Sequence, residues 1–137
     1  MIAIGSIHHV TLTVKDLDRS IRFYTQLLGL QPIERPSFPF KGAWFKVGTQ
    51  QLHLIEREEK QRTSSLVINP QQQHVAFRAK NIQKALEWLR TNGYKEDHPE
   101  PTQRLLVKLE SRAGFPQIFL FDPDGHLLEI NAEDKGD

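Results

Sequence analysis

The chain has 137 residues, 38% of them hydrophobic, and a formal net charge of +1. This length predicts one ordinary domain, or two small modules that share a core. The charges nearly cancel and Lys and Arg do not cluster, so we expect no nucleic-acid partner. The apolar opening MIAIGS is only a few residues long, so we expect no signal peptide, no membrane span and a cytoplasmic protein. Cysteine is absent, which excludes disulfides and zinc–thiolate sites; any metal must be bound by nitrogen and oxygen.

The first half of the chain begins with a strand pattern followed by a helix pattern. Residues Ile7 to Val14 alternate between apolar and polar side chains, which predicts a half-buried strand. Asp16 and Asp18 are candidate helix caps, and the apolar spacing after them predicts a helix that ends at Gly29. Two further strands are predicted in GAWFKV and QLHLIE, joined by a turn around Gly48.

The same order of patterns returns after a polar connector at residues 57–72, whose apolar SLVI predicts an ordered middle. HVAFRAK predicts a strand from His74, and NIQKALEWLRTNG predicts a helix with Asn81 as its cap and Gly93 as its end. Four strand candidates follow, in YKED, RLLVKL, PQIFLF and HLLEIN. The last two flank the sequence DPDG at residues 122–125, which predicts a hairpin because proline presets φ and glycine accepts a positive φ.

The second half therefore repeats the first. At an offset of 65 residues His9 coincides with His74, and at an offset of 76 His53 coincides with Glu129 and Phe45 with Phe121. Such a repeat indicates one structural module used twice. We expect an α+β fold in a single domain at 5–132, made of two βαβββ modules at about 7–56 and 73–132. Their curved mixed sheets would surround a shared cleft.

Four polar residues stand at matching places in this repeat. Each alternates with apolar neighbours, so each should point away from the helix that covers its sheet. These residues are His9, His53, His74 and Glu129. Each taken alone is more often an ordinary core or surface residue, but their coincidence at equivalent positions favours a shared divalent first-row metal such as Zn, Ni, Fe, Mn or Co. Four protein ligands would leave positions on the ion for water or substrate, which is typical of a catalytic site.

Four other residues are candidates for substrate binding. Trp44, Phe119 and Phe121 could line the cleft, although aromatic residues in strands usually belong to the core. The sequence does not decide which of Phe119 and Phe121 faces inward. Arg112 is a candidate for an anionic substrate group, and its alternative is a surface loop arginine.

Three stretches carry a resemblance to a known family: HHVTLTVKDLDRSIRFYTQLLGL, QHVAFRAKNI and QIFLFDPDGHLLEI. Over residues 7–131 the chain resembles the vicinal oxygen chelate superfamily, which includes glyoxalase I, methylmalonyl-CoA epimerase, fosfomycin-resistance proteins, extradiol dioxygenases and bleomycin-resistance proteins. The resemblance implies a glyoxalase/dioxygenase-like fold, with metal ligands at His9, His53, His74 and Glu129. At the second of these positions bacterial glyoxalase I typically has glutamate and the epimerases glutamine, so His53 departs from both patterns.

The resemblance leaves three functions open. The first is a metal-dependent glyoxalase-like lyase or isomerase that acts on a small α-oxygenated carbonyl compound, with Glu129 or His53 as the catalytic base. The second is an extradiol-type dioxygenase with Fe(II) on His9, His74 and Glu129. The third is a metal-free binding protein of the bleomycin-resistance type. We expect a small-molecule substrate and a homodimer, with the site formed either within one chain or across two subunits.

Overall fold

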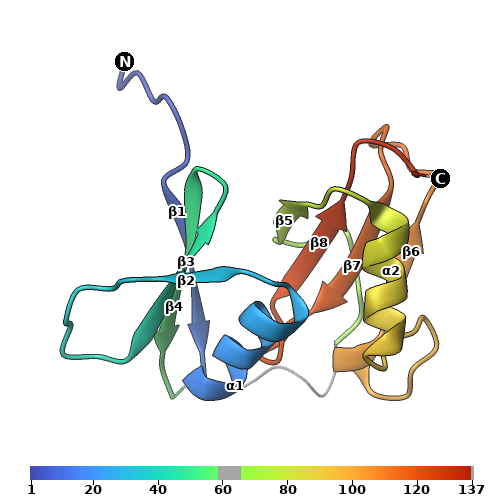
Figure 1. The fold of residues 1–137 in the computed structure, drawn as a ribbon. Helices are drawn as coiled ribbons and strands as arrows, with labels where there is room; N and C mark the ends of the chain where they lie inside the picture. Colours follow the sequence, from blue (N-terminus) through green and yellow to red (C-terminus); the bar gives the residue numbers. More distant parts are fainter. Residues whose placement is uncertain (59–65, 137) are drawn as a thin grey trace. The chain divides into compact units, whose positions relative to one another are not determined.

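A computed structural model describes residues 1–58 and 66–136 and divides the chain into two compact units, Met1–Lys60 and Gln61–Asp137. Each unit contains one four-stranded sheet with a helix against it (Figure 1). Of the apolar SLVI in the connector, only Ser65 lies outside the described residues; Leu66 and Ile68 pack against the cluster of Phe119, Phe121 and Leu127, without forming a helix or strand. In the described ranges, no helix is long and apolar enough to cross a membrane.

The first unit has the order strand, helix and three strands. Its elements are β1 (His9–Val14), α1 (Leu17–Arg22), which continues as a π-helical turn η1 (Phe23–Leu27), β2 (Gln31–Ile33), β3 (Gly42–Val47) and β4 (Gln50–Glu56). The second unit has the same order, with a 3₁₀ helix added. Its elements are β5 (Val75–Arg78), α2 (Ile82–Thr91), η2 (Pro101–Gln103), β6 (Leu106–Lys108), β7 (Gln117–Phe121) and β8 (Leu127–Asn131).

The two sheets share one topology. The strand orders are β1-β4-β3-β2 and β5-β8-β7-β6, so the first and last strands of each unit are neighbours. These neighbours pair in parallel, and the other pairs are antiparallel. Two mixed sheets built from βαβββ units confirm the predicted α+β fold.

The pairing registers reproduce the repeat found in the sequence. Val10 lies beside Leu52 in the first unit, and Val75 lies beside Leu128 in the second. The offset of 65 maps Val10 onto Val75 and the offset of 76 maps Leu52 onto Leu128, so the two pairs are equivalent. Because the register decides which side chains share a face of a sheet, the two units present equivalent positions on equivalent faces.

One alignment drawn from the sequence is wrong by one residue. Phe45 pairs with Leu52, and the residue opposite Leu128 is Leu120 rather than Phe121. The cause is the second hairpin, in which Asp122 N–H donates to His126 O (2.9 Å) and closes a turn one residue longer than the turn at residues 48–49. A slip of one residue moves a side chain to the other face of the sheet.

Both helices begin at side chains that the sequence predicts as caps. Asp16 Oδ1 and Asn81 Oδ1 each accept a hydrogen bond from the backbone N–H three residues further on, at 3.1 and 3.0 Å. Asp18, the other candidate cap, lies in the first turn of α1. Gly29 follows the helical segment with a φ of 73°, as a C-terminal glycine does.

Two strand assignments differ from the sequence analysis. The expected strand in YKED is absent: in this described segment only Lys95 forms an isolated bridge, to Arg104. Conversely, β2 has no clear sequence pattern because it is short and contains Pro32. The proline is tolerated because β2 is the edge strand of its sheet, where a backbone N–H is not needed on the outer side.

Apolar side chains fill the helix-covered face of each sheet. The main buried residues there are Val14, Tyr24, Phe45, Leu52 and Leu54 in the first unit, and Ile82, Leu86, Leu89, Ile118, Leu120 and Leu128 in the second. Burial of each such side chain contributes about 1.5–3 kcal/mol. The alternation of the strands then leaves His9, His53 and Glu129 on the opposite faces, while His74 directly precedes β5.

Candidate metal centre

In the first unit, three rings of the polar face form a stack. His53 lies directly opposite Trp44 in the β3–β4 pair, and their rings are 4.1 Å apart with 4° between the planes. The imidazole of His9 covers the other side of His53, at 4.1 Å and 15°. The stack buries His53, which is only 7% exposed.

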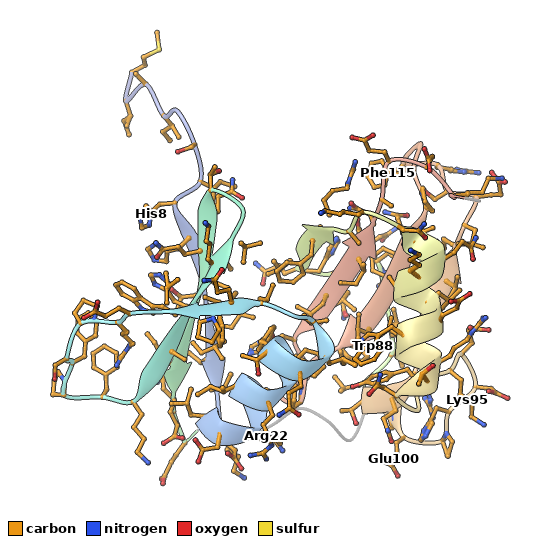
Figure 2. All side chains as sticks on the ribbon, viewed as in Figure 1. His8, Arg22, Trp88, Lys95, Glu100 and Phe115 are labelled. Atoms are coloured by element: carbon orange, nitrogen blue, oxygen red, sulfur yellow. The ribbon has the colours of Figure 1, made fainter. Side chains whose placement is uncertain are left out.

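One nitrogen of each histidine has a hydrogen-bond partner in this arrangement. His53 Nε2–H donates to Gln51 Oε1 (2.8 Å), because an amide oxygen can only accept, and the lone pair is then on Nδ1. His9 Nδ1 lies 2.8 Å from Nδ1 of His8, the residue that precedes β1 (Figure 2). The rings of His9 and His53 are thus parallel neighbours, and one nitrogen of each ring is engaged by another side chain.

Burial lowers the pKa of His53 from 6.5 to about 4, and the positive charges of His9, His8 and Arg35 add to this effect. Desolvation disfavours the charged imidazolium, and nearby positive charge disfavours it further. His53 is therefore neutral at pH 7. A neutral imidazole is the form that binds metals.

In the second unit, His74 and Glu129 form a pair. His74 Nε2 lies 3.3 Å from Glu129 Oε1, and the carboxylate side chain is only 6% exposed. His74 Nδ1–H donates to the backbone carbonyl of Gln72 at 2.7 Å. That bond fixes the orientation of the ring and places Nε2 toward Glu129, the arrangement found in metal-binding histidines.

Two further side chains hold the carboxylate of Glu129, and a third holds one of these two. Gln117 Nε2 donates to Oε1 (3.1 Å), and Asn131 Nδ2 donates to Oε2 (2.6 Å). Asn131 Oδ1 in turn accepts from Arg78 Nε at 2.6 Å. These residues were not predicted from the sequence, although their alternation with the buried residues of β5, β7 and β8 places them on the same face as Glu129.

The substrate-binding candidates have different environments. Trp44 is half-buried in the histidine stack. Phe119 pairs with Glu129 across the strands and Phe121 is two residues further along, so both lie on the face of Glu129. Both pack in a hydrophobic cluster with Leu127. The ring of Phe119 also meets His74 edge-on at 5.7 Å. Arg112 is exposed in the loop between β6 and β7 and forms no hydrogen bond or ion pair with another described residue.

Each unit thus brings together two of the four ligands expected from the sequence, His9 with His53 and His74 with Glu129. No group of three or more His, Asp or Glu side chains within residues 1–58 and 66–136 has the spacing of a metal site. The donors are imidazole nitrogens and one carboxylate. This set fits a divalent first-row metal, and the orientation of His74 fits it best.

The sequence pattern of residues 6–130 matches the family model of the Glyoxalase/Bleomycin resistance protein/Dioxygenase superfamily, and the chain belongs to this superfamily. It is 32% identical over 130 residues to Glyoxylase I 4 of Arabidopsis thaliana, covering 91% of this chain and 69% of that protein. It is 29% identical over 136 residues to the lactoylglutathione lyase of Salmonella typhimurium, covering 93% of each. The expected family is confirmed, and its relatives include enzymes.

The fold also resembles a solved structure that contains a metal. A variant of the fosfomycin resistance protein FosX from Listeria monocytogenes, in complex with Mn(II) and 1S,2S-dihydroxypropylphosphonic acid, superposes with a TM-score of 0.67 at 21% identity. The match covers 96% of this chain and 93% of FosX. At this identity the similarity supports the fold.

Proposed function

We propose that this protein is a metal-dependent, glyoxalase-like lyase or isomerase acting on a small α-oxygenated carbonyl compound, with His9, His53, His74 and Glu129 as the metal ligands. The observation that carries the proposal is the contact between His74 Nε2 and Glu129 Oε1 at 3.3 Å. With the hydrogen on Nδ1, a neutral His74 directs a lone pair at a carboxylate oxygen. Two acceptors facing each other at this distance require a proton or a metal ion between them.

The distance itself supports a metal. Imidazole nitrogen and carboxylate oxygen bind zinc at about 2.0–2.2 Å, so two such ligands on one tetrahedral ion lie about 3.4 Å apart. The hydrogen bonds from Gln117 and Asn131 hold the carboxylate in position without removing its negative charge. Superfamily membership and relatives named as lactoylglutathione lyases agree with this assignment.

When bound, the metal would stabilise negative charge that develops on adjacent oxygens of the substrate. Released from the metal, Glu129 Oε1 would remove the proton from the carbon next to the carbonyl and return it to the neighbouring carbon, while Asn131 fixes Oε2. Transfer of a proton by a positioned base typically contributes about 10² to 10⁴ in rate. When His53 is not bound to the metal, its Nδ1 lone pair is available, because Nε2–H donates to Gln51, and His53 is then a second proton acceptor.

The test combines elemental analysis with turnover. We expect about one first-row metal per chain, and isomerisation of the methylglyoxal–glutathione adduct that stops on chelation and returns with added metal. His74→Ala and Glu129→Gln should each lose the metal and at least about 10² in kcat/KM. His98→Gln is the matched control, since His98 lies in an exposed loop where its Nδ1 accepts from Glu100 N–H. A metal-free protein in which all four ligand substitutions have no effect would overturn the proposal.

A second candidate is an extradiol-type dioxygenase, and the hydrogen bond from His53 Nε2 to Gln51 favours it. If His53 stays outside the metal shell, His9, His74 and Glu129 remain as the two-histidine, one-carboxylate set of non-haem Fe(II) oxygenases. This candidate predicts iron in the purified protein and oxygen-dependent turnover of catechols. Turnover of the methylglyoxal adduct without oxygen would exclude it.

A further inference from the structure

The loop between β2 and β3 contains a cation held by two aromatic rings. The guanidinium carbon of Arg35 lies 4.7 Å from the ring centre of Phe38 and 5.1 Å from that of Phe40. Arg35 Nη2–H also donates to the backbone carbonyl of Phe40 at 3.0 Å. The two rings stack on each other at 5.1 Å and remain 41% and 43% exposed. The loop therefore presents a fixed positive charge beside exposed aromatic surface.

This loop is continuous with the histidine stack of the first unit. Phe38 lies 6.2 Å from Trp44, and Trp44 lies against His53 at 4.1 Å. Arg35 and the candidate ligands of the first unit thus lie along one continuous row of aromatic rings.

Arg35 has hydrogen-bonding capacity left over. In the described part of the chain no carboxylate lies within ion-pair distance of it, and its buried Nε has no hydrogen-bond partner. A buried, unpaired N–H of a charged group is costly, so such a group is usually satisfied by a partner or a ligand. Lys46 lies on the same face of β3 as Trp44, so the charge of this face favours an anion.

The backbone beside Arg35 is adapted to this position. A side chain at Gly42 would place its Cβ 2.8 Å from Arg35 Nη2 and 2.4 Å from the carbonyl oxygen of Leu54. Only glycine leaves that space to the guanidinium. The position of Arg35 therefore depends on Gly42 in β3 as well as on the aromatic residues of the loop.

We propose that Arg35 binds an oxyanion carried by the substrate, a carboxylate or a phosphonate, while Phe38 and Phe40 cover the adjoining apolar part of the molecule. The proposal rests on the proposed function in that it assigns this ligand to the same site. The guanidinium N–H groups match the oxygens of either anion, and charged hydrogen bonds of this kind are stronger than neutral ones. Arg35 is then the residue that selects anionic over neutral substrates.

The experiment measures binding of three probes of similar shape: benzoate, phenylphosphonate and the neutral benzamide. Trp44 fluorescence reports binding in a Trp88→Phe background, because the chain has only these two tryptophans. We expect at least one anion to bind at least tenfold more tightly than benzamide, and the better of the two identifies the anion class. Arg35→Gln should weaken its binding roughly 10- to 100-fold and leave benzamide unchanged.

Matched variants distinguish loss of anion binding at Arg35 from loss of folding and from loss of metal binding. Lys41→Gln removes a positive charge from the same loop, at a residue that contacts Glu56, and should leave anion binding unchanged. Arg35→Lys keeps the charge without the planar fork and should bind the anion with intermediate affinity, which tests the subsite even if the glutamine variant is unstable. Metal content should be the same in all variants, so a protein that binds anions but no metal refutes the proposed function alone. Equal binding of anions and benzamide, or unchanged anion binding in both Arg35 variants, would overturn the subsite.

Discussion

The indole of Trp44 lies flat against the imidazole of His53, with ring centres 4.1 Å apart and 4° between the planes. The two residues are direct cross-strand partners in β3 and β4, so the sheet register fixes the contact. With His9 on the opposite side, this contact closes His53 from water on both faces of its ring. Trp44 therefore contributes to the burial of a proposed metal ligand, and that burial is the largest cause of the lowered pKa of His53.

Trp44→Leu should raise the pKa of His53 from about 4 toward 6.5, because desolvation is the largest cause of the lowered value. The pKa is measured by NMR titration of the imidazole protons in the metal-free protein. Trp88→Phe, which changes an exposed tryptophan on α2, is the control and should leave the pKa of His53 unchanged. A pKa that stays near 4 in Trp44→Leu would contradict the burial argument.

His53 should also make stability depend on pH. Its pKa is about 4 in the folded state and 6.5 when unfolded, so between these values the unfolded chain binds more protons. The free energy of unfolding should therefore fall as the pH decreases from 6.5 to 4, by an amount on the order of 1–3 kcal/mol after screening by solvent. Urea unfolding across this range measures the effect, and His53→Gln should flatten the curve by that amount. Parallel curves for the two proteins would refute the assignment to His53.

Asn131 should position Glu129 for metal binding. Its Nδ2 donates to Glu129 Oε2 at 2.6 Å, and its Oδ1 accepts from Arg78 Nε. Asn131→Ala leaves Oε2 without this donor, and loss of such an outer partner typically costs about 10- to 100-fold in metal affinity. Calorimetric titration with Zn(II) or Mn(II) measures the change. Asn69→Ala is the control, since Asn69 accepts a hydrogen bond in an exposed turn; equal affinities for the two variants would contradict the prediction.

Two glycines in equivalent hairpins should differ in their tolerance of alanine. Gly48 has a φ of 60° and open space around the position of a Cβ, whereas Gly125 has a φ of 85° and its Cβ would lie 3.2 Å from Leu66. Gly48→Ala should cost about 1–2 kcal/mol of unfolding free energy, from the left-handed backbone alone. Gly125→Ala should cost about 1 kcal/mol more, because Leu66 packs on the Phe119 and Phe121 cluster and must shift. Denaturant unfolding compares the two, and equal costs would show that Leu66 moves freely.

Elements that depend on local patterns could be predicted from the sequence. Period-two alternation placed His9, His53 and Glu129 opposite the buried residues of their strands, and the pairing registers confirm these faces. The caps Asp16 and Asn81 were identified because a cap interacts with a backbone group only three residues away. That all four ligands share one ion stays a prediction.

The sequence by itself determined the doubled βαβββ plan, the caps and the polar faces, because each follows from interactions between near neighbours along the chain. Only the tertiary structure decided the hairpin register that separates Phe45 from Phe121, the edge strand that tolerates Pro32, and the contacts of the candidate site. Glu129 meets Asn131 and Gln117, and Arg35 packs against the rings of Phe38 and Phe40, through side-chain contacts. Such packing depends on turn lengths and on contacts between strands that are distant in the sequence. The periodicity of residue types does not predict either of these.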